Sequence, residues 1–208
     1  MTAEAAPDDG LRRCPWPGRH ADYRAYHDFE WGRPVADDQR LFEKVCLEGF
    51  QSGLSWLTIL RKREAFRRAF RDFDYEKVAR FNERSVERLL GDADIVRHRG
   101  KIEAAIANAR LACELADEAG SIAAWLWRFE PDPASRPKRI TPATLRRLTE
   151  SAASRAMSRE LRARGWRFVG PTTLYAFMQS MGMVNDHLET CAFRSEVEVE
   201  RRRFRRPA

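Results

Sequence analysis

The segment SRELRARGWRFVGPTTLYAFMQSMG, residues 158–182, contains two helical patterns separated by a few residues. The first helix is expected to end at Gly165, because glycine readily adopts the left-handed conformation that closes a helix. The second is expected to begin after Gly170, with Pro171 in its first turn. This pattern is typical of a helix-hairpin-helix, whose glycines allow close approach to a phosphate while helix N-terminal amides, from Thr172 onward, donate to it. An ordinary antiparallel helix pair is the alternative.

Helical patterns also fill the rest of the middle of the chain. Asp37 or Asp38 is expected to cap one helix and Asn82 another, because short polar side chains accept hydrogen bonds from the first amides. Further patterns with helical spacing cover residues 55–70, 98–120 and 121–129. The proline-rich segment 131–142 is expected to cross the surface as a linker. With no convincing strand pattern, the sequence predicts an all-α fold.

Composition limits the class of protein. The chain has 208 residues, 43% of them hydrophobic, which is enough for one globular domain or two small lobes. No apolar run approaches the roughly 20 residues of a membrane span, and the acidic start MTAEAAPDDG lacks the features of a secretory signal, so we expect a cytosolic protein. The formal net charge of +7 fits a phosphate-rich partner, although the C-terminal RRRFRRPA contributes to it.

Two pairs of residues near opposite ends of the chain could bind a metal ion. In NDHLETC, His187 and Cys191 are four positions apart, so on a helix both would lie on one face. In CPWPGRHADYRAYH, Cys14 and His27 form a second pair. Two cysteines and two histidines suit tetrahedral zinc and leave no position for a reactive water. The four residues therefore predict one structural Zn²⁺ that joins the terminal segments.

Other interpretations of these residues remain open. His187 and Cys191 could simply share a packed apolar face, and His20 could replace His27 as a ligand. Cys46 and Cys113 lie on apolar stripes of expected helices, which indicates core positions.

An acidic residue occupies an apolar stripe in LFEKVCLEGFQSGLSW, residues 41–56. Leu41, Val45 and Glu48 follow one another at helical spacing, so Glu48 is expected to point inward. Glu48 could be a solvated acid at the helix end, or it could pair with an arginine. A third interpretation is a buried carboxylate that accepts hydrogen bonds from a ligand in a pocket. Aromatic residues close to it in sequence could form either core or a cage for a flat, cationic ligand: Trp16, Tyr23, Tyr26, Trp31 and Trp56.

Together these residues resemble the 3-methyladenine DNA glycosylase I family, within the helix-hairpin-helix glycosylase superfamily. The resemblance runs from about Cys14 to Cys191. It rests on motifs that occur in the family's order and with similar spacing, namely CPW, YHDFEWG, LFEKVCLEGFQSGLSW, IVRHRGKIEAAIANAR, RFVGPTT and NDHLETC.

The resemblance implies a two-lobed all-α fold that removes N3-methyladenine from alkylated double-stranded DNA. Nothing in the sequence indicates an obligate protein partner, so we expect a monomer. It implies that Cys14, His27, His187 and Cys191 bind the Zn²⁺. It also implies that Glu48 accepts hydrogen bonds from the damaged base, that Trp56 stacks on it, and that further residues complete or support the pocket: Tyr23, Tyr26, Trp16 and Trp31. Residues 1–12 are expected to form a flexible lead, 13–194 the catalytic domain, and 195–208 a charged, disordered tail.

Two questions of mechanism follow from the resemblance. Many relatives use an aspartate beyond the hairpin, and Asp186 is the nearby candidate here, although its neighbour His187 is assigned to zinc. A strand-cleaving lyase needs a nucleophilic lysine near the hairpin, and the five lysines lie elsewhere in the sequence: Lys44, Lys62, Lys77, Lys101 and Lys138. We therefore expect a monofunctional glycosylase. The alternatives are a non-catalytic DNA-binding module and a zinc hydrolase with an open metal position.

Overall fold

The computed structural model describes residues 9–208, and within this range all regular secondary structure is helical. The predicted flexible lead, residues 1–12, therefore lies largely outside the described residues. The α-helices are α1 (Ala21–Phe29), α2 (Asp38–Gln51), α3 (Trp56–Ala69), α4 (Tyr75–Ala79), α5 (Glu83–Gly91), α6 (Arg99–Ala119), α7 (Ile122–Trp127), α8 (Pro142–Arg147), α9 (Ala152–Ala163), α10 (Pro171–Ser180) and α11 (Arg194–Arg203), with 3-10 turns η1 (Arg71–Phe73) and η2 (Pro133–Ser135). No helix in residues 9–208 is long and apolar enough to cross a membrane.

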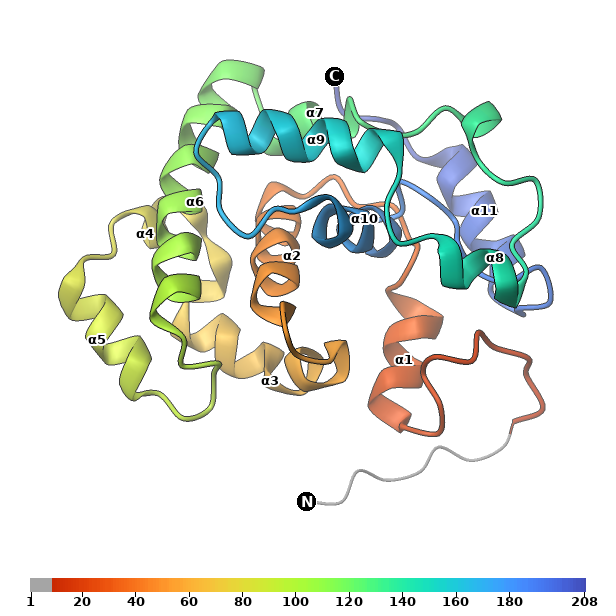
Figure 1. Cartoon of the computed structure of the whole chain (residues 1–208), viewed down its shortest axis with the longest axis horizontal. Helices are drawn as coiled ribbons and strands as arrows, with labels where there is room; N and C mark the ends of the chain where they lie inside the picture. Colours follow the sequence, from red (N-terminus) through yellow and green to blue (C-terminus); the bar gives the residue numbers. More distant parts are fainter. Residues whose placement is uncertain (1–8) are drawn as a thin grey trace.

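Helix α2 lies at the centre of the molecule. It packs against α3, α6, α7 and α10, and every residue from Leu41 to Phe50 is buried. In Figure 1, α4, α5 and α6 lie on one side of α2, α1, α8 and α11 lie on the other, and α3 passes below it. Helix α2 is therefore surrounded by elements from both halves of the sequence.

Local capping explains several helix boundaries. The Asp37 carboxylate accepts a hydrogen bond from the Arg40 amide at 2.8 Å and begins α2. Asn82 and Ser85 form a capping box at the start of α5. Gly120, with φ of 79°, closes α6 in the left-handed conformation. The two caps predicted near residues 37 and 82 are confirmed, because a cap depends on only a few neighbouring residues.

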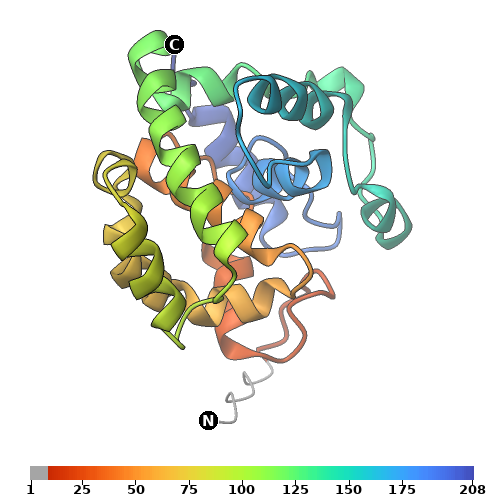
Figure 2. The ribbon, with the colours of Figure 1, turned by 60° about the vertical axis from the view of Figure 1, so that its left-hand side comes forward.

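The predicted helix-hairpin-helix is formed by α9 and α10. Gly165 follows the end of α9 with φ of 93°, and Pro171 is the first residue of α10. Figure 2 shows the two helices lying one above the other, joined by the connecting loop. Neighbouring side chains fix that loop, since the Asn108 amide donates to the Arg167 carbonyl at 3.0 Å and accepts from its N–H at 2.9 Å.

The expectation of a disordered tail is wrong for residues 195–203, which lie in α11. Val197 is fully buried, while Glu196 and Glu200, one helical turn apart, both pair with Arg33. Arg201 binds Glu130 at 2.9 Å. The alternation in EVEVE, residues 196–200, is typical of a strand. The residues that stabilise the helix instead, Arg33 and Glu130, are distant in the sequence, so the local pattern does not indicate them.

The segment NDHLETC also differs from expectation, because residues 185–191 are not helical. A turn brings the two ligand candidates together, with the Cys191 N–H donating to the Leu188 carbonyl at 2.9 Å. Next to it, the Ala192 N–H donates to the Arg12 carbonyl at 2.8 Å, so the two terminal segments pair directly.

A test of the packing concerns Gly182, in the turn after α10. Its φ is 74°, and a Cβ added there would lie 2.4 Å from the Pro34 nitrogen. We expect Gly182→Ala to lower the free energy of unfolding by about 3 kcal/mol or more, since left-handed strain and overpacking add. Urea unfolding followed by circular dichroism measures this. Gly91→Ala, where the added Cβ meets nothing within 4 Å, is the control, and equal stability of the two variants would contradict the packing.

Candidate functional site

A cavity of about 260 Å³ lies against the central helix. Its wall contains every aromatic residue proposed above for a flat ligand, together with Glu48. The remaining wall comes from α2, α8 and α10 and their ends. The full lining is Trp16, Tyr23, Tyr26, Trp31, Glu48, Gln51, Trp56, Leu145, Leu148, Ala176 and Gln179. The structure thus brings the six predicted pocket residues together, while their individual roles remain predictions.

Glu48 is the acidic group of this cavity and is only 6% exposed. Its carboxylate lies 3.4 Å from the Lys44 ammonium, one turn earlier on α2. Burial raises the pKa of Glu48, and the charge of Lys44 opposes that rise. The expected inward orientation is therefore correct, and the partner is a lysine on the same helix rather than an arginine. A buried, paired carboxylate can accept hydrogen bonds from a ligand without a large rearrangement.

Aromatic rings surround the acid and hold one another in place. Trp16 contacts Tyr23 and Trp31, with ring centroids 4.9 and 5.1 Å apart. Tyr26 lies 5.4 Å from Trp56. Burial raises the pKa of Tyr23 to about 12, with a further contribution from the negative charge of Glu48. The wall is therefore neutral and flat, which suits an aromatic ligand.

The four predicted metal ligands form one buried cluster. The ligand atoms of Cys14, His27, His187 and Cys191 all lie within 4.8 Å of one another. The Cys191 sulfur is 3.3 Å from the His187 Nδ1 and 3.7 Å from the His27 Nε2. The Cys14 contact is the largest influence lowering the pKa of Cys191, and both histidines add to it. A thiolate is the form that binds a metal.

The outer contacts of the two histidines fit metal binding. His27 Nδ1 lies 2.7 Å from a carboxylate oxygen of Asp28, and His187 Nε2 lies 3.1 Å from the Trp31 carbonyl. Such contacts fix the ring orientation and leave the other nitrogen facing the cluster. None of the four cluster residues lines the cavity, because Trp16 and Trp31 stand between.

The start of α10, in the hairpin, borders a groove beside the cavity. This groove contains Thr172 and Thr173 from the start of α10, and it shares Glu48, Gln51 and Ala176 with the cavity. Its outer edge is the turn between α2 and α3, which carries the exposed Leu54. Of the predicted backbone-binding residues, Thr172 lies in this groove and Gly170 precedes it, whereas Gly165 lies at the other end of the loop, near Leu111.

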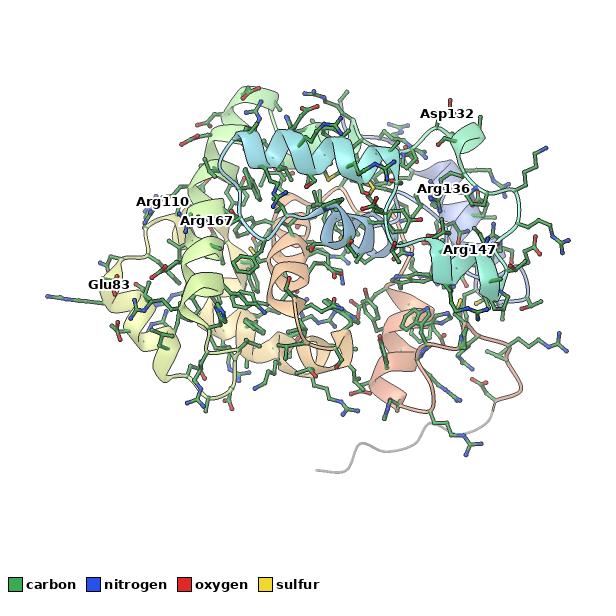
Figure 3. All side chains as sticks on the ribbon, viewed as in Figure 1. Glu83, Arg110, Asp132, Arg136, Arg147 and Arg167 are labelled. Atoms are coloured by element: carbon green, nitrogen blue, oxygen red, sulfur yellow. The ribbon has the colours of Figure 1, made fainter. Side chains whose placement is uncertain are left out.

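Asp186 is fully buried and does not line the cavity. Tyr175 donates to its carboxylate at 2.7 Å and Gln179 at 2.9 Å, while Arg136 forms an ion pair with it. Of these, Gln179 lines the cavity. Figure 3 places Arg136 and Arg147 on the α8 side of the molecule, away from Arg110 and Arg167 near α6. Asp186 therefore reaches the cavity through Gln179, and its own catalytic role stays a prediction.

Two lysines lie closer to the site than their sequence positions indicated. Lys101 donates to the carbonyls of Phe50 and Ser52, in a small cavity that Phe168 of the hairpin loop also lines. Lys44 contacts Glu48. The five lysines are separated from the hairpin in the sequence, but in space Lys101 lies beside the hairpin loop. The absence of lyase activity stays a prediction. It now depends on the contacts that hold both ammonium groups, to the two carbonyls for Lys101 and to Glu48 for Lys44.

A hairpin beside an acid-bearing aromatic cavity has the layout of a protein that holds a nucleic-acid backbone and one flat base. The methyladenine glycosylase family model matches residues 16–195. DNA-3-methyladenine glycosylase 1 of Escherichia coli (strain K12) is 46% identical over 182 residues, covering 87% of this chain and 96% of the relative. The chain belongs to the methyladenine glycosylase family, so the predicted resemblance and enzyme class are confirmed.

Solved structures agree with this assignment. A crystal structure of a 3-methyladenine DNA glycosylase I is 44% identical, with a TM-score of 0.80 over 87% of this chain and 98% of that chain. A variant of a 3-methyladenine DNA glycosylase I in complex with 3-methyladenine is 33% identical, with a TM-score of 0.81 over 88% and 97%. The predicted all-α helix-hairpin-helix fold is therefore confirmed.

Sequence reasoning missed several residues of the site. Lys44 stands one turn before Glu48 and could have been recognised as a charge partner from that spacing. Leu145, Leu148 and Gln179 reach the cavity only through the packing of α8 and α10, and no local signal indicates it.

The bracing of the hairpin loop can be tested with Asn108→Ala. We expect a loss of about 2 kcal/mol in the free energy of unfolding, because two hydrogen bonds to Arg167 disappear. We also expect about tenfold weaker binding of duplex DNA, equivalent to about 1.4 kcal/mol. Fluorescence anisotropy with labelled duplex measures the binding. Asn82→Ala, which removes the cap of α5 far from the loop, should lose stability alone, and equal DNA affinity of both variants would argue against the bracing.

Proposed function

We propose that this protein hydrolyses the N-glycosidic bond of N3-methyladenine in alkylated double-stranded DNA. The observation that carries the proposal is Glu48, a buried carboxylate facing an aromatic cavity beside the hairpin. The E. coli relative is named as a DNA-3-methyladenine glycosylase, and a related structure contains 3-methyladenine. A pure DNA-binding module has no need for an acid in such a cavity.

The nucleotide must leave the duplex before its base can enter the cavity, at a cost of a few kcal/mol that a weakened pair reduces. In this proposal the first amides of α10, from Thr172 on, hold the backbone phosphate while the base rotates outward. Phosphate contacts of this kind position the DNA without reading its sequence. The groove shared by Thr172 and Glu48 gives the strand a continuous path to the cavity.

Selection of the base then follows from its chemistry. N3-methylation gives the adenine in DNA a positive charge, which distinguishes it from the neutral, unmodified base. Glu48 accepts a hydrogen bond from the amino group, which is a stronger donor in the cationic base than in unmodified adenine. Trp56 stacks on the base, while Tyr23 lines the cavity with Trp16 and Trp31. Because Trp16 and Trp31 contact the cluster histidines, we assign them to the wall.

Cleavage breaks the bond between C1′ of the sugar and N9 of the base. The electron pair leaves with the base, and a water oxygen bonds to C1′ and releases a proton. The methylated base is already a good leaving group, so the residues need supply little acid catalysis. We propose that Asp186 acts by orienting Gln179, to which it is hydrogen bonded, rather than by touching the sugar.

The cluster of Cys14, His27, His187 and Cys191 is proposed to hold one structural Zn²⁺. Four side-chain ligands leave no position for a reactive water, which disfavours a zinc hydrolase. When bound, the ion supplies a fixed junction between the terminal segments and no chemistry at the base. Trp16 and Trp31, which contact the histidines, are then held in the cavity wall.

The central test is incubation of the purified protein with methylated duplex DNA, followed by chromatography of the released bases. We expect free 3-methyladenine, and no strand cleavage at the resulting abasic site. Release no greater than in a protein-free sample would refute the proposal.

Glu48→Gln is the matching site variant in this assay. It should weaken binding of free 3-methyladenine by about 10- to 100-fold, since a charged hydrogen-bond acceptor becomes neutral, while duplex affinity stays unchanged. Glu64→Gln makes the same chemical change on an exposed part of α3 and should behave as the unaltered protein.

If the cluster holds a structural Zn²⁺, atomic emission spectroscopy should find one metal ion per chain. Cys14→Ser should lower the metal content and the melting temperature together, because metal binding and folding are coupled. Cys113→Ser, outside the cluster, is the control and should keep its metal. A preparation that is metal-free yet equally stable would remove the structural role.

A further inference from the structure

Lys44 is a buried ammonium group that the mechanism above does not use. It is 5% exposed. Its Nζ donates to the Tyr26 hydroxyl at 2.7 Å, lies 3.4 Å from the Glu48 carboxylate, and stands 3.5 Å from the centroid of the Trp56 ring. Each of these three partners lines the base cavity, whereas Lys44 lines a smaller cavity behind it. Lys44 therefore touches the base-binding residues from the rear.

The charge of the base changes during the proposed reaction. The methylated base is cationic in the intact nucleotide and becomes neutral when the glycosidic electron pair moves onto it. An unbalanced Glu48 carboxylate would attract the cationic base strongly, and this attraction would fade as the bond breaks. An interaction that is stronger in the ground state than in the transition state slows the chemical step. The cavity therefore needs an acceptor for hydrogen bonds whose net charge is balanced.

We propose that Lys44 is a positioning residue that fixes the Glu48 carboxylate and balances its charge, so that the cavity selects the base by its N–H donors. This inference rests on the proposed function. The ammonium also lies on the ring of Trp56, where it opposes the attraction of that ring for a second cation. Both effects favour the neutral departing base over the cationic bound one.

The surroundings of Lys44 support a balanced charge rather than an isolated one. The charged and titratable groups that share its rear cavity are Tyr26 of α1, Glu30 directly after α1, Arg40 and Glu43 of α2, and Arg63 and Arg67 of α3. Arg63 pairs with Glu30 at 2.5 Å and Arg67 with Glu43 at 2.9 Å. Both glutamates of this cavity are thus paired with arginines, while Glu48 lies within ion-pair distance of Lys44.

Burial lowers the pKa of Lys44 to about 8, against the opposing influence of Glu48. The charged form is therefore present at neutral pH and is lost as the pH rises through about 8. The charge of Lys44 should then be visible as a fall in the cleavage rate on the alkaline side.

The test compares the unaltered protein with Lys44→Met in single-turnover cleavage of methylated duplex DNA at saturating enzyme, from pH 6 to 9.5. We expect the rate of the variant at pH 7 to fall about tenfold, as for one lost charge-assisted contact, with duplex affinity not weakened. The alkaline decline of the rate should be absent in the variant. An equal rate and an equal pH profile in the two proteins would overturn the proposal.

Lys62→Met is the matched control, because it removes the same charge from a lysine whose Nζ donates to the Ala93 and Asp94 carbonyls. Its rate and pH profile should match those of the unaltered protein. A tenfold loss in this variant too would show a general charge effect and overturn the role of Lys44.

A measurement on the unaltered protein separates this proposal from the glycosylase activity itself. In a ¹³C titration of the lysine Cε resonances, Lys44 should titrate near pH 8, well below the exposed lysines at about 10.4. Absence of base release would refute the proposed function, while a second titration, in Glu48→Gln, would still report the pairing. Because the Glu48 carboxylate opposes the fall in the pKa of Lys44, its loss should lower that pKa further, and an unchanged Lys44 titration in Glu48→Gln would overturn the pairing even if the base is released.

Discussion

A carboxylate inside the core is the constraint on which the rest of this structure depends. Glu48 lies on α2, the helix with the longest continuous buried stretch, and an unpaired charge there would cost several kcal/mol. Lys44 provides its counter-charge from one turn away, and aromatic rings form much of the cavity wall around it. The cavity and the core are therefore one unit, and the stability of α2 and the chemistry of the pocket cannot be varied independently.

Different residues line the cavity, hold the hairpin loop and form the Cys and His cluster. The hairpin loop is held by Asn108, outside the cavity. The Cys and His cluster is buried behind two tryptophans that form part of the wall. Asn108 holds the hairpin loop, and the cluster contacts Trp16 and Trp31 of the wall. Neither Asn108 nor the cluster lines the cavity itself. This explains how a small cavity can be bordered by segments from both ends of the chain and still keep a defined shape.

Much of this organisation could be predicted from the sequence. The hairpin, the cap residues, the four cluster residues and the inward position of Glu48 all follow from local spacing or from side-chain chemistry. Residues that meet only through tertiary packing could not be predicted, as Gln179 and Leu145 show. The prediction of a disordered C-terminal segment was wrong for the same physical reason. The ion pairs that stabilise α11 join it to Arg33 and Glu130, which are both distant in the sequence.

The pairing of Arg12 with Ala192 has a consequence for how the protein is made. Because synthesis proceeds from the N-terminus, Cys14 and His27 leave the ribosome long before His187 and Cys191 are available to them. The contact that holds Trp31 against His187 thus forms only after the chain has been translated beyond that residue. A chain that stops before His187 lacks half of the Cys and His cluster behind the cavity wall.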